Sequence, residues 1–336
     1  MKTIVSIIIP TLNENHYIVD CVKSVLNFEI PPGYEIEIII ADGMSQDNTR
    51  ELVTTNFASF PISIIDNEAI FQANGINKAI KLSKGDFIMR LDAHAIYPKD
   101  YLHKCLKLIN ETGADNVGGA VHTLQGAETF SAKIVQSLTT HPFGVGDSTF
   151  RTVEYKGEVD TVPYGFFRRE IFEKVGLLNE KLIRAQDYEF NRRIQYEGGT
   201  VYIDSSIKIK YFNQSSLFNF YGKQFFKEAP YNAYMWYLAP YTFTIRHAIT
   251  SVFALGIIFG LVFSLIHVFF LYVYCFILTI YGVMAILSTF QQVRRYRDIR
   301  LLFPLPFCFF GFHFIHGLGV LKGIFLLLLG KAPVQN

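Results

Sequence analysis

The chain has 336 residues, of which 50% are hydrophobic, and a formal net charge of only +2, from 31 Lys and Arg against 29 Asp and Glu. This near balance gives no basis for nucleic-acid binding, because such proteins offset phosphates with an excess of basic residues. The four cysteines are spaced neither as a disulfide framework nor as a zinc cluster. The length allows two domains or one domain with a membrane anchor, and the almost unbroken apolar stretch at 247–290 favours the anchor.

The first ten residues, MKTIVSIIIP, place one charge ahead of an apolar run. This run is shorter than the core of a signal peptide, Pro10 ends it, and no small-residue cleavage site follows before Asn13. We therefore expect a first buried strand at 5–9 and a soluble part that stays in the cytosol. Its continuous β-branched residues are typical of a strand covered on both faces.

Strands and helices alternate after this first strand. The pattern predicts a helix at about 17–26, strands at 36–40 and 60–65, and a helix at 73–82. This order favours the α/β class, with a Rossmann-like, mostly parallel sheet and helices on both faces. There is no Gly-x-Gly-x-x-Gly after the first strand and no Gly-x-x-x-x-Gly-Lys-Ser/Thr loop, which counts against a dinucleotide-binding dehydrogenase and a P-loop ATPase.

A fourth strand at 87–91 ends in Asp92, Ala93 and His94. An extended backbone puts the side chains of Asp92 and His94 on one side, and strand ends of this kind face the ligand crevice of open α/β sheets. A carboxylate with an imidazole suits Mn²⁺ or Mg²⁺ better than a closed zinc site. Taken alone, the triplet also fits a polar strand end ahead of the turn at Pro98.

Three loops occur in order: IIIPTLNE at 7–14, ADGMSQDNT at 41–49 and LDAHA at 91–95. Together they resemble the signature loops of family 2 glycosyltransferases, the inverting enzymes with the GT-A fold. Within that family, the Asp-Ala-His form and the apolar tail are most similar to the succinoglycan-type exopolysaccharide glucosyltransferases. The resemblance implies a hexosyltransferase that uses a nucleotide-diphosphate sugar.

The resemblance also implies a donor site. Its nucleotide-sugar-binding residues would be Pro10, Thr11, Asn13, Glu14, Asp42, Ser45, Asn77 and Asp92. Asp42 would accept a charge-assisted hydrogen bond from the imide N–H of uracil, although Asp42-Gly43 alone is also an ordinary turn.

The metal ligands implied by the resemblance are Asp92 and His94, since His94 stands where most relatives have the second acid of an Asp-x-Asp motif. The cofactor would be Mn²⁺ or Mg²⁺, with Mn²⁺ favoured because Mg²⁺ prefers oxygen ligands. Imidazole binds a metal only when neutral, so activity should fall in mild acid.

Residues 163–176 and 185–193 resemble the acceptor-binding half of the family. The general base implied there is Asp187, and a helix amino terminus would stabilise its charged carboxylate. Without the resemblance, Asp187 would be read as a helix cap. Acceptor-side residues would be Tyr164, Gly165, Gln186 and Arg192, where Gln186 replaces the family's Glu. Between 123 and 159 we expect a mobile acceptor-side loop, or else a plain surface loop.

A last strand at 202–211 closes a predicted cytosolic GT-A catalytic domain of residues 1–212. Aromatic residues interleaved with Lys and Glu at 213–246 favour interfacial amphipathic helices, with a buried helical hairpin as the alternative. Residues 247–336 are expected to form the transmembrane domain. Its parts would be spans at about 248–266 and 269–290, a basic cytosolic loop at 291–300, and a broken apolar segment at 301–330.

These features predict a membrane-anchored, metal-dependent, inverting glycosyltransferase in the plasma membrane, multi-pass and with its catalytic domain in the cytoplasm. It would transfer a sugar from a UDP-sugar, with UDP-glucose as the first candidate, to a polyprenyl-linked or polysaccharide acceptor in exopolysaccharide, capsule or cell-wall glycan biosynthesis. One alternative is a processive synthase, whose Gln-x-x-Arg-Trp motif is only faintly matched at 292–296. The other is a non-catalytic sugar-nucleotide or lipid-binding subunit of an assembly complex.

Overall fold

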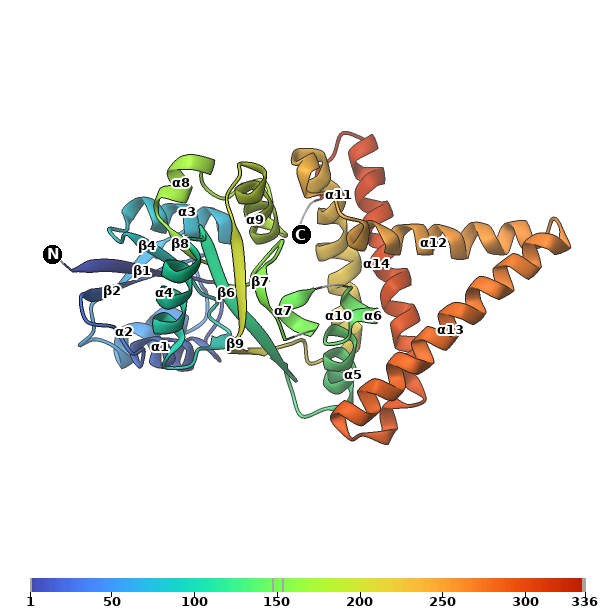
Figure 1. Cartoon of the computed structure of the whole chain (residues 1–336), viewed down its shortest axis with the longest axis horizontal. Coiled ribbons are helices and arrows are strands. Elements are labelled where there is room, and N and C mark those ends of the chain that lie inside the picture. Colours follow the sequence, from blue (N-terminus) through green and yellow to red (C-terminus); the bar gives the residue numbers. More distant parts are fainter. Residues whose placement is uncertain (1, 147, 153, 334–336) are drawn as a thin grey trace. The chain divides into compact units, whose positions relative to one another are not determined.

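The computed structural model describes residues 2–146, 148–152 and 154–333. It divides into two compact units, which we call the sheet unit (1–122 and 153–212) and the helical unit (123–152 and 213–336). Figure 1 shows the elements of both. The segment 123–152 therefore packs with the helical unit, although it lies inside the range predicted for the catalytic domain.

A single sheet organises the sheet unit. Within the described residues its order is β3-β2-β1-β4-β8-β6-β9-β5, with β7 paired to β9. The strands are β1 (Thr3–Thr11), β2 (Tyr34–Asp42), β3 (Ile62–Asp66), β4 (Phe87–Arg90), β5 (Ala95–Ile96), β6 (Asn116–Leu124), β7 (Lys156–Glu158), β8 (Phe166–Arg168) and β9 (Val201–Phe212). The pairs β1–β2, β2–β3 and β1–β4 are parallel, whereas β8 joins β4 and β6 antiparallel. The α/β class is confirmed, and the sheet is mixed.

Helices cover this sheet (Figure 1). They are α1 (Ile18–Leu26), α2 (Thr49–Asn56), α3 (Gln72–Leu82), α4 (Tyr101–Thr112), α8 (Glu170–Val175) and α9 (Gln186–Tyr196). Residues 5–9 of β1 are fully buried, as expected of a strand covered on both faces. Helix α3 packs against β1 and β2. Helix α4 ends at Gly113, whose positive φ of 67° suits a residue without Cβ.

The register of the parallel strands places the carboxyl ends of β1, β2 and β4 side by side. Thr11 pairs with Asp42, and Asp42 pairs with Asp66. Strand β4 runs beside β1 with Ile8 opposite Arg90, and the chain then leaves the sheet toward Asp92. The loops after β1, β2 and β4 therefore start from the same edge of the sheet.

The helical unit begins with three short helices, α5 (Phe130–Thr139), α6 (Pro142–Val145) and α7 (Thr149–Thr152). It continues with α10 (Leu217–Lys223), the π-helix η1 (Gln224–Glu228), α11 (Ala229–Leu238), the 3₁₀-helix η2 (Pro240–Thr242), α12 (Ile245–Ser264), α13 (Val268–Tyr296), the 3₁₀-helix η3 (Ile299–Leu301) and α14 (Pro304–Leu328).

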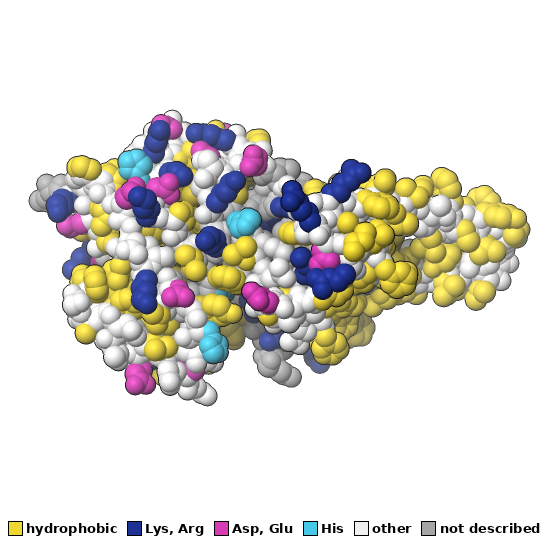
Figure 2. Space-filling model, turned by 90° about the horizontal axis from the view of Figure 1, so that it is seen from below, with side chains coloured by type: hydrophobic (Ala, Val, Ile, Leu, Met, Phe, Trp, Pro, Cys, Tyr) yellow, Lys and Arg dark blue, Asp and Glu magenta, His cyan; other side chains and the backbone are white. Residues whose placement is uncertain are grey.

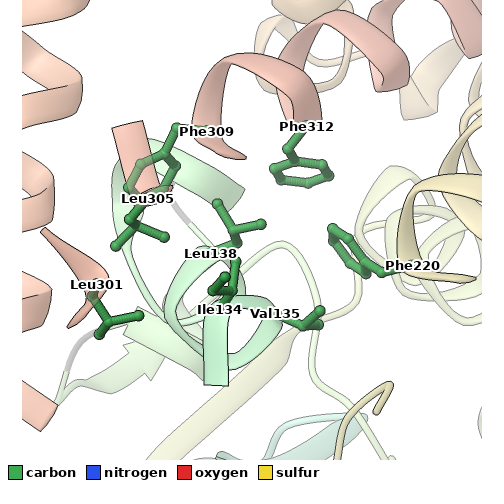
Figure 3. Packing of buried hydrophobic residues seen from close by; sticks show 8 residues of the cluster. All are labelled: Ile134, Val135, Leu138, Phe220, Leu301, Leu305, Phe309 and Phe312. Carbon is green, nitrogen blue, oxygen red and sulfur yellow. The ribbon is translucent and has the colours of Figure 1, made fainter. Parts of the chain in front are cut away.

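A buried core joins α5 to the C-terminal helices (Figure 3). Ile134, Val135 and Leu138 of α5 pack in one cluster with residues of α14, including Phe309, and with Phe220 of α10. The prediction of a loop at 123–159 is therefore wrong over α5. Its apolar residues recur at helical spacing with polar residues between them, which is the pattern of an amphipathic helix.

Helix α14 is continuous over 25 residues, although its prolines and glycines suggested a broken segment. Its prolines lie in the first turn, where the missing N–H is not needed. Its glycines lie where other helices approach closely. A Cβ at Gly317 would be 2.0 Å from the carbonyl oxygen of Thr250, and one at Gly323 would be 2.5 Å from that of Pro230. These glycines are packing residues rather than helix breaks.

Three helices of the described chain, α12, α13 and α14, are long and apolar enough to cross a membrane, with 20, 29 and 25 residues. Large hydrophobic side chains are exposed along α12 and α13, and hydrophobic side chains predominate on the protruding arm in the view of Figure 2. The C-terminal apolar helices expected from the sequence are thus present.

Candidate active site

The loops that follow β1 and β2 are joined by hydrogen bonds. The backbone N–H of Asn13 donates to Ser45 Oγ over 2.9 Å, and the N–H of Gln46 donates back to Asn13 Oδ1 over 2.9 Å. The N–H of Glu14 donates to Thr49 Oγ1 over 2.8 Å. Two of the three signature loops therefore form one wall, with the predicted residues Thr11, Asn13, Glu14, Asp42 and Ser45 in it.

Asp42 lies at the base of this wall and is fully buried. Its Oδ1 accepts from Thr11 Oγ1 (3.2 Å) and Ser45 Oγ (2.6 Å). Its Oδ2 accepts from the N–H of Ser45 (3.0 Å) and from Arg50 (3.2 Å). Four donors match the acceptor capacity of a carboxylate, so Asp42 fixes the loop, and a bond to a uracil N–H requires that one donor be displaced. Its contact with the base stays a prediction.

Several non-glycine residues of the sheet unit have a positive φ and lie beside the predicted site. Within the described residues of the sheet unit, the non-glycine residues with positive φ are Asn13, Met44, Ile70, Tyr164 and Ala185. Four of them lie in or next to the predicted site segments, and the fifth, Ile70, places its carbonyl oxygen 3.0 Å from where a Cβ of Gly43 would be. Strained residues of this kind concentrate at functional sites.

Asp92 lies in a polar network at the end of β4. Its Oδ1 accepts from Arg90 over 2.8 Å and from Gln72 Nε2 over 3.1 Å. The side chain is 15% exposed, and its Oδ2 has no partner among the described residues. Asp92 thus offers one carboxylate oxygen to a ligand, while the other is held by the protein.

Asp187 opens α9 next to this network. Its Oδ2 lies 3.3 Å from a guanidinium nitrogen of Arg90. Burial raises the pKa of Asp187, Arg90 lowers it and Asp92 raises it, with a net upward shift. The side chain is nevertheless 37% exposed, so solvent offsets part of this desolvation. A carboxylate with a raised pKa that remains accessible can take a proton from a bound hydroxyl.

Gln186 extends the same network. Its Nε2 donates to Gln72 Oε1 over 2.5 Å, and Gln72 donates in turn to Asp92. Tyr164 packs under the network, with its ring centroid 5.7 Å from the guanidinium carbon of Arg90, and the carbonyl of Gly165 accepts from the N–H of Arg90. The structure therefore brings Asp92, Gln186 and Asp187 together with Tyr164.

His94 faces the first loop. Its Nδ1 lies 3.1 Å from Glu14 Oε1, and its ring lies beside those of Tyr17 and Tyr211. Across the part of the chain that the structure describes, no three His, Cys, Asp or Glu side chains are grouped to enclose a metal ion. However, a cation that shares a substrate diphosphate needs only one or two protein ligands. The assignment of Asp92 and His94 as ligands of Mn²⁺ or Mg²⁺ stays a prediction, which the oxygen and imidazole donors of the two side chains support chemically.

Two predicted site residues, Asn77 and Arg192, bond to other residues of the sheet unit. The amide of Asn77 is buried and bonds to the backbone of Leu178 and to Glu180. Arg192 donates to Gln195 on its own helix. Pro10 lies at the end of β1, next to Thr11. The roles assigned to Asn77 and Arg192 stay predictions, and their observed contacts are within the protein.

Sequence reasoning missed two residues of the network, Arg90 and Gln72. A charge at the end of the otherwise apolar run FIMR, two residues before Asp92, was a signal for Arg90. Nothing in the local sequence marks Gln72, because its importance comes from the approach of α3 to α9.

Comparisons with known proteins identify the family. Residues 6–176, more than half of the chain, match Glycosyl transferase family 2. A protein of Methanococcus voltae, dolichyl N-acetyl-alpha-D-glucosaminyl phosphate 3-beta-D-2,3-diacetamido-2,3-dideoxy-beta-D-glucuronosyltransferase, is 29% identical over 335 residues, covering 95% of this chain and 97% of that protein. The succinoglycan biosynthesis protein ExoA of Rhizobium meliloti is 29% identical over 222 residues, which are 65% of this chain and 66% of ExoA.

Solved structures share the fold. A mannosyltransferase from Pyrobaculum calidifontis in complex with GDP-Man and Mn²⁺ matches with a TM-score of 0.60 at 14% identity, over 96% of this chain and 88% of that chain. TarS 1–349 of S. aureus in complex with UDP-GlcNAc matches with a TM-score of 0.51 at 16% identity, over 98% and 93%. The fold is thus the GT-A fold, and the family match makes the chain a glycosyltransferase. The chain belongs to glycosyl transferase family 2 and is an enzyme of polysaccharide or glycan biosynthesis.

Proposed function

We propose that the protein is a membrane-anchored, inverting hexosyltransferase that transfers a sugar from a UDP-sugar, with UDP-glucose as the first donor to test. The observation that carries the proposal is that Asp187 and Asp92 both pair with Arg90. This arrangement puts one proton acceptor and one donor-side acid next to each other. The wall of the first two loops supports a nucleotide site beside Asp92. The solved TarS complex with UDP-GlcNAc is consistent with a UDP-sugar donor.

In the proposed mechanism, Asp187 accepts the proton of the acceptor hydroxyl as that oxygen attacks the anomeric carbon. The attack comes from the face opposite the nucleoside diphosphate and passes through an oxocarbenium-like state, as in glycoside hydrolysis. A single displacement inverts the anomeric carbon, so that an α-linked donor gives a β-linked product. The cation held by Asp92 and His94 would supply positive charge to the leaving diphosphate.

The proposed acceptor is a polyprenyl-linked sugar or a polysaccharide at the membrane. Support comes from the apolar helices α12 to α14 and from the Methanococcus voltae relative, whose name gives a dolichyl-phosphate-linked sugar as its acceptor. We further propose a multi-pass plasma-membrane protein with the catalytic side in the cytoplasm, where nucleotide sugars are made. The predicted catalytic domain of residues 1–212 is retained as a proposal.

Release of nucleoside diphosphate by the detergent-solubilised full chain tests the function. UDP-glucose, UDP-N-acetylglucosamine and GDP-mannose are compared with Mn²⁺, with Mg²⁺ and with EDTA. We expect release from a UDP-sugar with Mn²⁺, and a loss of about 100-fold in Asp187→Asn, a typical contribution of a general base. Asp100→Asn, which changes an acid at the start of α4 outside the site, is the matched control. Equal rates in all samples would instead favour a non-catalytic binding subunit.

A further inference from the structure

The buried guanidinium of Arg90 is unusual in its surroundings. Arg90 ends an otherwise apolar strand and is only 6% exposed. Burying a cation is costly unless carboxylates compensate it, and two do so here: Asp92 at 2.8 Å and Asp187 at 3.3 Å. Although burial lowers the pKa of Arg90, Asp187 and Asp92 raise it above the ordinary value, so the group is a permanent cation.

Packing alone does not fix this guanidinium. Its Nε is buried without a hydrogen-bond partner, and Arg90 lines a cavity of about 20 Å³ together with Asp187, Asn191 and apolar side chains. The guanidinium is therefore oriented by its two carboxylates and by the Tyr164 ring. Each carboxylate is reciprocally held by the same cation.

A second connection runs parallel to the first. Gln186, the neighbour of Asp187, donates to Gln72, and Gln72 donates to Asp92. Asp92 is thus tied to the start of α9 by one ionic path and one amide path. This closed ring fixes the separation of the two acids. Because it contains two carboxylates and one cation, its net charge is negative when both acids are ionised.

Resting on the proposed function, we infer that Arg90 is a positioning residue that holds Asp187 at the distance and orientation from Asp92 at which it can accept the acceptor's proton. Arg90 itself touches neither donor nor acceptor in this role. The amide path through Gln72 and Gln186 supports the same geometry from the other side.

A double-mutant cycle tests the inference, because a residue that acts through Asp187 loses its effect when Asp187 is gone. UDP release from the best UDP-sugar of the panel is measured for Arg90→Met, Asp187→Asn and the double variant. We expect Arg90→Met to lower kcat about 100-fold with a much smaller change in KM. In the Asp187→Asn background, the same change should lower kcat less than about threefold. Losses that multiply in the double variant would overturn the inference.

Stability is controlled with Arg193→Met. Arg193 lies on α9 and pairs with the buried Glu189 at 2.8 Å. This variant should unfold at a lower temperature yet keep kcat within about threefold, and an equal loss of kcat in both variants would assign Arg90 a merely structural role.

Arg90→Lys keeps the inference testable if Arg90→Met fails to fold. An ammonium keeps the charge but lacks the planar fork that reaches two carboxylates, so we expect about a tenfold loss of kcat that again vanishes with Asp187→Asn. Wild-type kcat in Arg90→Lys, or a loss that persists with Asp187→Asn, contradicts the positioning role. If Asp187→Asn alone were fully active, the proposed function would fail, whereas additivity in the cycle removes only the role of Arg90.

Discussion

At the scale of single residues, Ile70 is the clearest conflict between local preference and structure. It has φ of 69°, which costs a residue with Cβ roughly 1–2 kcal/mol, while its side chain is 48% exposed. Ile70→Asn should therefore stabilise the fold by about 1 kcal/mol, because Asn adopts this conformation readily and the Ile70 side chain is already about half exposed. The apparent Tm in detergent should rise by about 2–4 °C. Ile30→Asn, at a similarly exposed residue without positive φ, should change little, and a larger gain there would contradict strain as the cause.

Asp187 leads to a prediction about pH. A general base works only when ionised, and the pKa of Asp187 is raised in the fold. As pH falls, activity should therefore begin to decline above the range in which an ordinary aspartate titrates. Protonation of a metal-binding imidazole would also lower activity in acid, but excess Mn²⁺ competes with that proton and does not compete with the proton on a base. We expect kcat/KM of the wild type, measured at saturating Mn²⁺, still to decrease toward low pH. If added Mn²⁺ abolished this decrease completely, the titrating group would instead belong to the metal site.

At the scale of elements, the contact between α14 and α12 depends on a glycine. A Cβ at Gly317 would overlap the backbone of Thr250, and backbone cannot move as a flexible side chain does. We expect Gly317→Ala to lower the free energy of unfolding by roughly 1–3 kcal/mol. The apparent Tm and the yield of folded protein should fall with it. Gly282→Ala on α13 is the matched control, since nothing lies within 4 Å of its Cβ position. Equal behaviour of the two variants would show that α12 and α14 do not pack as described.

Some of the strands and helices could be predicted from the sequence, and others could not. Continuous β-branched runs and polar strand ends were enough for β1, β2 and β4, because burial on both faces and an abrupt end are local signals. The position of α5 was not predictable, since Ile134 and Leu138 belong to a core completed by Leu305 and Phe309, far along the chain. For the site, the acids Asp92 and Asp187 followed from motifs. The ring through Arg90 and Gln72 did not, because tertiary contacts alone create it.

At the scale of the whole molecule, three crossings by α12, α13 and α14 would put the segment after α13 on the catalytic side and the turn after α12 on the other. Exposed sites are available at Leu265, Arg297 and Lys331. In intact cells, a membrane-impermeant maleimide should label Leu265→Cys and Lys331→Cys, and it should label Arg297→Cys only after permeabilisation. The unsubstituted chain should stay unlabelled, because Cys21 and Cys105 are buried, while Cys275 lies within α13 and Cys308 within α14.

Each labelling pattern decides a separate step of this topology. Labelling of Arg297→Cys in intact cells would reverse the proposed orientation and put the site away from cytosolic nucleotide sugars. Labelling of Leu265→Cys without Lys331→Cys would mean that α14 does not cross, although its length of 25 residues suffices. The expected pattern requires every crossing to hold at once, since polar chain ends cannot remain within the hydrocarbon layer. It would therefore show on which side of the membrane the proposed site of Asp92 and Asp187 lies.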